Sequence, residues 1–212
     1  MWGRDRGGAT SMGYQRKMTP SDMPVEERAQ ELETTRWARE FSWDEILALA
    51  RYLRRFTAED GTVIVEEGTT DRSLTILLDG KVDVLRTDRA GRQRIITTLT
   101  KPQAFGEIAL LDAQPRSASV RAATEVKVLV MSYANFELLC QEEKDVALHF
   151  VRKLGSLACN RIRQTSWWLV EAMELLAESE PILEAMADLD VSASSEVRQA
   201  AEEALRRLRA KS

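Results

Sequence analysis

The sequence predicts an α+β protein with a mainly β core, an antiparallel β-roll or jelly roll flanked by N-terminal and C-terminal helices. Two observations lead to this fold class. Five glycines between residues 61 and 106 are spaced as turns between short segments, whose apolar residues alternate with the two-residue period of half-buried strands. No helical crossovers connect these segments, which favours a closed sandwich or barrel over parallel βαβ units.

Three parts are predicted along the chain. Four of the ten glycines lie in residues 1–13, so residues 1–34 are expected to be a flexible N-terminal tail. Residues 35–165 are expected to hold the strands and their flanking helices. Residues 166–212 are expected to be a helical C-terminal extension with a net charge of −5, from ten Asp and Glu against five Lys and Arg.

The first helix is predicted to begin at Ser42. Glu45, three residues later, completes a capping box, and Phe41 and Ile46 are placed as a hydrophobic staple. The strands that follow are expected at residues 62–67, 73–80, 81–87, 94–100, 117–122 and 125–132.

A long helix is predicted after the last strand. Its apolar stripe runs through Val146, Phe150, Leu154 and Ile162, and this stripe must be buried against the strands or against a partner. Farther on, Pro181 and the turn-like residues behind it predict that the extension is split into about three short helices.

The composition is that of a globular protein without a strong charge bias. The 212 residues are 44% hydrophobic and 30% charged, and the net charge of −4 gives no general attraction to nucleic acid or anionic lipid. Cys140 and Cys159 lie in helical patterns without CxxC spacing, so both are expected to be reduced thiols. No run of about 18 apolar residues occurs, and no apolar stretch lies near residue 1. We therefore expect a cytoplasmic protein that neither binds nor spans a membrane.

The segment "FGEIALLDAQPRSASV", residues 105–120, carries the most specific chemical signal. Gly106 allows close backbone approach to a ligand, and the amides that open a short helix at Glu107 suit a phosphate. The Glu107 carboxylate suits a sugar hydroxyl, and the Arg116 guanidinium suits a phosphate gripped by two parallel hydrogen bonds. Together these groups predict a ligand in which one phosphate is fused to a sugar.

The same segment resembles the phosphate-binding cassette of the cyclic nucleotide-binding domain family, FGE-x-A-L and then, after a short spacer, P-R-x-A-[ST]-V. The resemblance covers residues 35–165 and implies a β-roll of the catabolite activator and protein kinase regulatory subunit type. In that family the residue matching Glu107 binds the ribose 2′-hydroxyl, and the residue matching Arg116 binds the cyclic phosphate. Ser117 favours cyclic AMP as the ligand, with cyclic GMP left open. The ligand-binding residues implied by the resemblance are Gly106, Glu107, Ile108, Ala109, Arg116, Ser117 and Ala118.

Plainer interpretations of these residues stay open at this point. Glu107 and Arg116 can be interpreted as a structural ion pair that ties two turns together. Trp167 and Trp168 can be interpreted as a lid that stacks on a nucleobase, or as ordinary helix packing. A ligand-free scaffold domain is a further alternative, against which the intact Glu107 and Arg116 argue.

Enzyme classes find little support. His149 is the only histidine, so neither a cupin-like metal site nor a Ser-His-Asp arrangement can be assembled, and no P-loop lysine is present. We predict no enzyme activity and no metal. The predicted function is a cyclic nucleotide sensor whose C-terminal helices pass the signal to a protein partner or to a second copy of the chain.

A transcription regulator of the Crp/Fnr type, with an atypical or missing DNA-binding domain, is the alternative function. The family's winged helix-turn-helix is basic and contains strands. The acidic residues 166–212 show no strand pattern, and phosphate contacts dominate DNA affinity, so we predict no nucleic acid partner.

Overall fold

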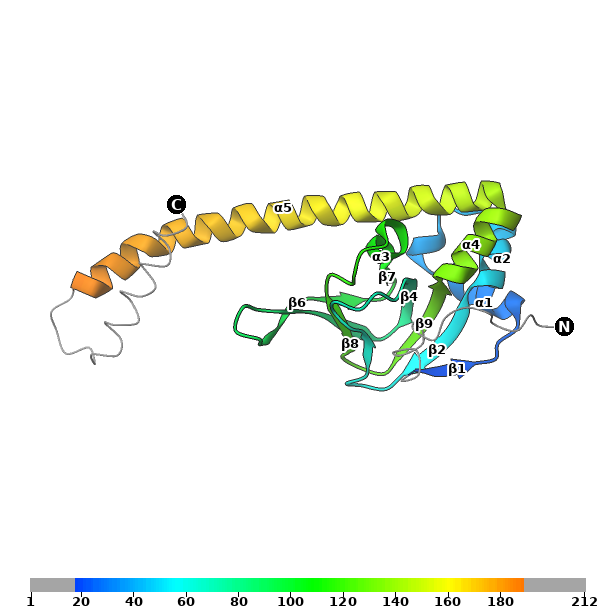
Figure 1. Cartoon of the computed structure of the whole chain (residues 1–212), viewed down its shortest axis with the longest axis horizontal. Helices are drawn as coiled ribbons and strands as arrows, with labels where there is room; N and C mark the ends of the chain where they lie inside the picture. Colours follow the sequence, from blue (N-terminus) through cyan, green and yellow to red (C-terminus); the bar gives the residue numbers. More distant parts are fainter. Residues whose placement is uncertain (1–17, 189–212) are drawn as a thin grey trace. The chain divides into compact units, whose positions relative to one another are not determined.

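Two antiparallel sheets form a β-roll in the computed structural model, which describes residues 18–188, with side chains as far as residue 177 (Figure 1). One sheet has the strand order β1-β2-β9-β4-β7, and the other has the order β3-β8-β5-β6. The predicted fold class is confirmed. The strands are β1 Thr19–Ser21, β2 Arg54–Ala58, β3 Val63–Val65, β4 Ser73–Asp79, β5 Lys81–Thr87, β6 Gln93–Thr100, β7 Gln103–Phe105, β8 Ser119–Ala122 and β9 Val126–Ser132.

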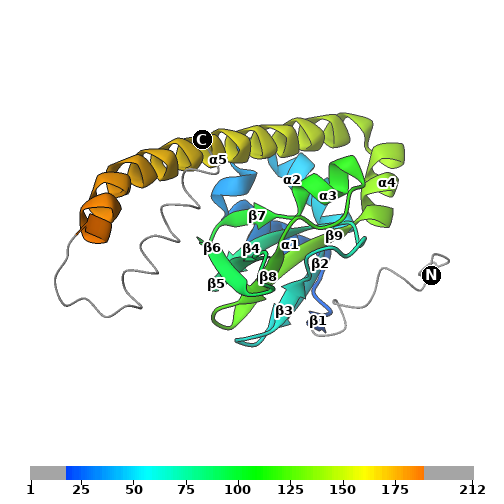
Figure 2. The same ribbon diagram turned by 60° about the vertical axis from the view of Figure 1, so that its left-hand side comes forward.

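Helices lie before, within and after the strands. Helices α1, α2 and α4 lie beside β2, β4 and β9, whereas α3 interrupts the roll between β7 and β8 (Figures 1 and 2). The helices are α1 Val25–Glu33, the 3-10 helix η2 Arg36–Ala38, α2 Trp43–Tyr52, α3 Glu107–Asp112, α4 Tyr133–Glu142 and α5 Lys144–Asp188. No helix in residues 18–188 has the length and apolarity that crossing a membrane requires.

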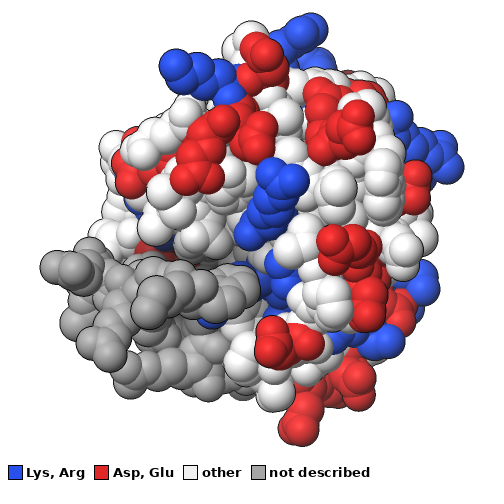
Figure 3. Space-filling view, turned by 90° about the vertical axis from the view of Figure 1, so that its right-hand side faces the viewer, with Lys and Arg blue, Asp and Glu red and all other residues white. Residues whose placement is uncertain are grey.

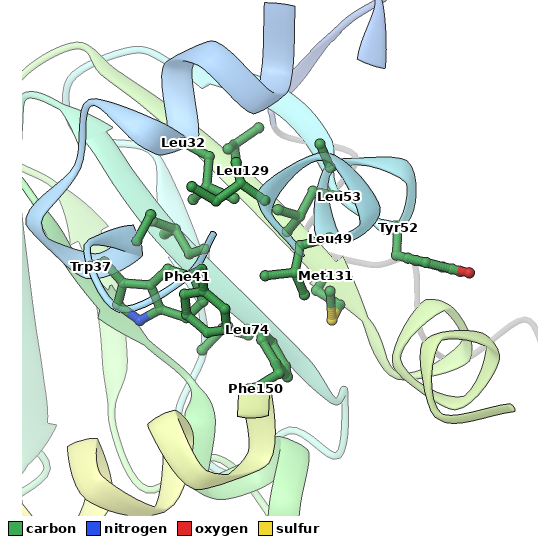
Figure 4. Close-up of a cluster of buried hydrophobic side chains, with 14 of the residues drawn as sticks. Leu32, Trp37, Phe41, Leu49, Tyr52, Leu53, Leu74, Leu129, Met131 and Phe150 are labelled. Carbon is green, nitrogen blue, oxygen red and sulfur yellow. The ribbon is translucent and has the colours of Figure 1, made fainter. Parts of the chain in front are cut away.

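Strand β9 separates two hydrophobic cores. Val128 on one face is buried inside the roll with side chains such as Leu77 and Phe105. Leu129 and Met131 on the other face are buried against the helices, together with the residues drawn in Figure 4. The sequence predicted a strand buried on one face only. Five of the seven residues of β9 are buried, because helices cover its outer face as well.

The start of α2 is as predicted. The Ser42 hydroxyl accepts a hydrogen bond from the Glu45 backbone N–H at 3.4 Å, and the Glu45 carboxylate accepts one from the Ser42 backbone N–H at 2.8 Å. This reciprocal capping box satisfies two N–H groups that would otherwise lack partners, and the helix begins at Trp43.

The flexible tail predicted for residues 1–34 is wrong for its last part. Strand β1 pairs with β2, and α1 buries Ala29 and Leu32 completely in the core beneath the sheet. Arg28 is also buried, and its Nε–H donates to the Ala50 carbonyl at the end of α2, 3.1 Å away. The segment looks like a tail in the sequence because α1 is rich in charged residues, and its burial depends on partners farther along the chain.

The predicted split of the C-terminal extension at Pro181 is also wrong. Helix α5 runs without interruption from Lys144 to Asp188 and includes Pro181. A proline removes one backbone hydrogen bond from a helix, but the helix continues when the hydrogen bonds of the turns on either side are kept. The chain divides into two compact units at residue 157, rather than at the predicted boundary after residue 165. Phe150 is fully buried in the first unit, whereas every described side chain from 162 to 177 is exposed. The other predicted helices lie outside the described residues.

Candidate functional site

Gly106 links β7 to α3 in a conformation that favours glycine. Its φ of 88° and ψ of 6° are left-handed. A Cβ atom at this position would lie 2.5 Å from Nη1 of Arg116 and 2.5 Å from the backbone carbonyl oxygen of Ser73. The sequence predicted close approach of a ligand to Gly106. The close neighbours in the structure are the protein's own, namely the Ser73 backbone and the guanidinium of Arg116.

Glu107, the first residue of α3, is completely buried. Burial of a carboxylate is costly unless it has polar partners, and Glu107 does have an interaction within the chain. Ala109 on the same short helix is buried, whereas Ile108 is 41% exposed. The α3 residues predicted to bind a ligand thus differ in orientation, and the carboxylate of Glu107 faces inward.

Arg116 is buried, with 4% of its surface exposed, and is held by three partners. Nη2 donates to Ser73 Oγ at 2.8 Å, and Nη1 donates to the Gly106 carbonyl oxygen at 3.2 Å. Nη2 also donates to Asp71 Oδ2 at 2.8 Å, and Nε donates to Asp71 Oδ1 at 3.4 Å. These bonds engage four of the five N–H donors of a guanidinium. The side chain is therefore fixed in position by hydrogen bonds within the protein.

Asp71 is the partner of Arg116 that sequence reasoning missed. Its carboxylate also accepts a hydrogen bond from the Thr69 hydroxyl at 2.9 Å. Burial alone would raise the pKa of Asp71, but the hydrogen bonds and charge of Arg116, with the bond from Thr69, outweigh it and lower this pKa below 3.8. The carboxylate is therefore ionised at neutral pH and balances the buried guanidinium. The sequence suggested Glu107 as the ionic partner of Arg116. The ion pair found at Arg116 is with Asp71 instead, 45 residues away.

Backbone hydrogen bonds fix the loop that carries Arg116. The Arg116 N–H donates to the Thr69 carbonyl, and the Gly68 N–H donates to the Arg116 carbonyl, both at 2.8 Å. Ser117 is exposed at the next position, and Ala118 is partly exposed. The loop between β3 and β4 thus supplies both the anion that faces Arg116 and the scaffold that orients it.

The sequence between the second strand and the start of α5 identifies the domain. Residues 55–143 match the sequence model described as "Cyclic nucleotide-binding domain". These residues belong to the cyclic nucleotide-binding domain family. Within this domain, Gly106 is the N-cap of α3, Glu107 is its first residue, and Arg116 lies in the loop between α3 and β8.

Several curated proteins are similar to this cyclic nucleotide-binding domain. The chain is 35% identical over 127 residues to the cAMP-activated global transcriptional regulator Vfr of Pseudomonas aeruginosa, covering 58% of this chain and 56% of Vfr. It is 36% identical over 81 residues to a cGMP-dependent protein kinase of Plasmodium berghei, covering 38% of this chain and 9% of the kinase. The chain thus spans about half the length of the curated regulators that it matches.

Solved structures share the fold of the domain. A cyclic nucleotide-binding domain from Methylobacillus flagellatus has a TM-score of 0.67 at 20% identity, covering 79% of this chain and 97% of that chain. The catabolite activator protein of Thermus thermophilus has a TM-score of 0.58 at 23% identity, covering 82% of this chain and 85% of that chain. At sequence identities of 20% and 23%, these structures show that the fold is shared and nothing further.

Proposed function

We propose that the chain is a non-enzymatic sensor that binds a 3′,5′-cyclic nucleotide, with cyclic AMP as the preferred ligand. The observation that carries the proposal is the buried guanidinium of Arg116, which donates a hydrogen bond to the carbonyl oxygen of Gly106. Gly106 directly precedes the buried Glu107. Arg116 binds the cyclic phosphate, and Glu107 accepts the ribose 2′-hydroxyl. Gly106, Ile108, Ala109, Ser117 and Ala118 complete the proposed ligand-binding set.

Ligand binding at Arg116 involves an exchange of anions. Asp71 occupies the two donors of Arg116 that suit a planar, two-oxygen acceptor. A cyclic phosphate offers the same kind of acceptor with a full negative charge, so it either shares the guanidinium with Asp71 or takes over part of its hydrogen bonding. Since the site already holds an ionised pair, the arriving phosphate meets an oriented donor rather than a freely rotating side chain.

The base preference rests on the residue after Arg116. Ser117 is the feature that favours adenine over guanine in this family, and the name of the relative from Pseudomonas aeruginosa includes cAMP. The name of the kinase from Plasmodium berghei includes cGMP, so both nucleotides belong in the test. Parallel calorimetric titrations with cyclic AMP and cyclic GMP are the decisive experiment. Tighter binding of cyclic AMP supports the proposal, and absence of heat with both nucleotides overturns it.

The signal is proposed to leave the domain through its C-terminal helices, towards a protein partner or a second copy of the chain. Large apolar side chains are exposed in the second unit, among them Ile162, Trp167, Leu169 and Met173. Exposed apolar residues in such numbers are typical of an interaction surface. Sedimentation with and without cyclic AMP tests whether a second copy is that partner.

A DNA-binding regulator is the second candidate, because several relatives are named transcriptional regulators. Two features argue against it. Residues 166–212 carry a net charge of −5, and basic and acidic side chains are interspersed on the face drawn in Figure 3. Fluorescence anisotropy with duplex DNA at physiological salt distinguishes the two functions. Binding at micromolar or tighter affinity that depends on cyclic AMP supports the regulator instead.

A further inference from the structure

Arg72 lies between Asp71 and Ser73, two of the three residues that hold Arg116, and its own side chain binds a different part of the molecule. Asp71 and Ser73 both contact the guanidinium of Arg116. The Arg72 side chain instead donates from Nε to the Ala109 carbonyl at 3.2 Å, and from Nη2 to the Leu110 carbonyl at 3.0 Å. Three consecutive residues at the start of β4, Asp71 to Ser73, therefore hold both Arg116 and the helix that carries Glu107.

The two carbonyl groups that Arg72 binds belong to the end of α3. Carbonyls in the last turn of a helix lack partners within the helix, and a cation near them is favourable because of the helix dipole. Helix α3 has six residues, and its C-cap, Ala113, is in a left-handed conformation with φ of 58°. So short a helix has little stability of its own. Arg72 therefore fixes the position of α3, and with it the position of Glu107.

Arg72 also contacts the first residue of α4. The carbon at the centre of its guanidinium, Cζ, lies 3.4 Å from the centre of the Tyr133 ring, which is a cation–π arrangement. The backbone N–H of Tyr133 donates to the Arg72 carbonyl oxygen at 2.9 Å. The side chain and the backbone of one residue thus join the end of α3 to the beginning of α4.

From Tyr133, ring contacts lead to the buried start of α5. The ring centres of Tyr133 and Phe136 are 6.3 Å apart, and those of Phe136 and Phe150 are 6.0 Å apart. Phe150 has no exposed surface and also packs edge-on against Trp37, with ring centres 5.8 Å apart. Any movement of the Tyr133 ring would therefore press on Phe136 of α4 and, through it, on Phe150 of α5.

We propose that Arg72 is a positioning residue that couples α3 to α4, so that ligand capture at Glu107 and Arg116 changes the position of α4. The ligand-dependent part of this proposal rests on the proposed function. Coupling of this kind is reciprocal: if a bound nucleotide biases α4 through Arg72, a change at Tyr133 alters nucleotide affinity by the same factor. A residue that merely stabilises α3 would show no such effect on α4.

The test is hydrogen exchange on the full chain, with and without cyclic AMP, in wild type, Arg72→Lys and Arg94→Lys. Lysine keeps the charge of Arg72 but cannot bind two carbonyls and lie flat on a ring. Arg94 is the matched control because it is 62% exposed and pairs with Asp88 in the β5–β6 hairpin, 3.1 Å away. In wild type and in Arg94→Lys, cyclic AMP should slow exchange in both α3 and α4.

Arg72→Lys should still bind cyclic AMP, about three- to tenfold more weakly, and should retain the protection of α3 while losing that of α4. Equal protection of α4 in Arg72→Lys and wild type overturns the proposal and leaves the proposed function intact.

If wild type binds neither cyclic nucleotide, the proposed function fails, and the coupling between α3 and α4 is then tested by hydrogen exchange of the ligand-free protein. Arg72→Lys must then speed exchange about three- to tenfold in both α3 and the first turn of α4, and an effect confined to α3 overturns the coupling.

Variants at Tyr133 keep the test valid if Arg72→Lys does not fold. Tyr133→Phe retains the ring beneath Arg72, whereas Tyr133→Leu removes it. The coupling requires that Tyr133→Leu speeds exchange in α3 and that Tyr133→Phe does not. Identical α3 exchange in both variants contradicts it.

Discussion

The carboxylate of Asp71 binds the buried guanidinium of Arg116, with Oδ2 2.8 Å from Nη2 and Oδ1 3.4 Å from Nε. A protein anion thus occupies the donors that we assign to a ligand phosphate. The pair keeps Arg116 in one orientation and balances its charge. Under the proposed function, the affinity for a cyclic nucleotide should reflect how much better Arg116 binds the ligand phosphate than the carboxylate of Asp71.

Removing the guanidinium should abolish most of the affinity. A charge-assisted hydrogen bond contributes about 1.5 to 3 kcal/mol, so Arg116→Ala should weaken cyclic AMP binding at least ~10- to 100-fold in calorimetry. Arg116→Lys should recover only part of the loss, because an ammonium group cannot present two parallel donors. Arg94→Ala, on the exposed hairpin, serves as the control and should bind as wild type does. Unchanged affinity in Arg116→Ala would sink the assignment.

Asp71→Asn should destabilise the free protein in a pH-dependent way. It leaves Arg116 without its anion, and we expect a loss of about 1.5 to 3 kcal/mol in the free energy of unfolding at pH 7. The native pKa of Asp71 is lowered, so the stability it contributes is complete above the ordinary value of 3.8 and is lost as the pH falls through the native pKa. Urea unfolding from pH 7 down to pH 3 checks this: the gap between wild type and Asp71→Asn should narrow below about pH 4. A gap that stays constant with pH contradicts the pairing.

The features that the sequence predicts well are set by neighbours within a few residues. The capping box of Ser42 and Glu45 spans three residues, and Gly106 is required by its own φ together with the close approach of Arg116. Alternation within the strands likewise reflects local pleating. These signals can be found without knowing which strands pair.

The features that the sequence does not reveal depend on contacts between distant segments. Asp71 faces Arg116 across 45 residues, and nothing in "TTDRS" distinguishes it from a loop aspartate. Helix α1 is charged over most of its length, and its burial follows from packing on α2, to whose end Arg28 donates a hydrogen bond. Tertiary context overrides local pattern in both cases.

Two glycine substitutions should have opposite effects. In Gly106→Ala the new Cβ would lie 2.5 Å from the Ser73 carbonyl oxygen, and the left-handed backbone adds strain, so thermal stability and cyclic AMP affinity should both fall. Gly155 lies in α5, and a Cβ atom there would meet no atom within 4 Å other than the adjacent backbone of its own helix, so Gly155→Ala should stabilise the helix by about 0.5 to 1 kcal/mol. Differential scanning fluorimetry and calorimetry measure the two effects. Equal thermal stability of Gly106→Ala and wild type would contradict this prediction, because it would show that the connection between β7 and α3 can accommodate the new Cβ atom.

Tyr52 should make stability fall at high pH. Burial, followed by its hydrogen bond to Glu142 at 2.7 Å, raises the pKa of Tyr52 to about 12. A raised native pKa gives stability that is complete below the ordinary value of 10.0 and is lost as the pH rises towards 12. Denaturant unfolding at several pH values from 9 to 12 should show this slope in wild type, and Tyr52→Phe should show a smaller one. The same slope in both proteins would place the titrating group elsewhere.

Glu107 offers a test of the sugar contact that separates ligand binding from folding. If its buried carboxylate accepts the ribose 2′-hydroxyl, wild type should bind 2′-deoxy cyclic AMP worse than cyclic AMP by about 1.5 to 3 kcal/mol. Glu107→Gln keeps the size of the side chain but offers a neutral carbonyl, so its preference for cyclic AMP should shrink. Glu107→Ala should bind both nucleotides about equally. Thermal unfolding of each variant without ligand identifies any loss that comes from the fold.

The four affinities of wild type and Glu107→Ala for the two nucleotides form a double-perturbation cycle. Deleting the hydroxyl from the ligand and the carboxylate from the protein removes the same hydrogen bond, so the two losses should not add. A coupling free energy of about 1.5 to 3 kcal/mol is expected from such a charged hydrogen bond. Any damage that Glu107→Ala does to α3 affects both nucleotides alike and cancels in the cycle. Additive losses would therefore mean that Glu107 supports α3 without touching the sugar, even if overall affinity drops.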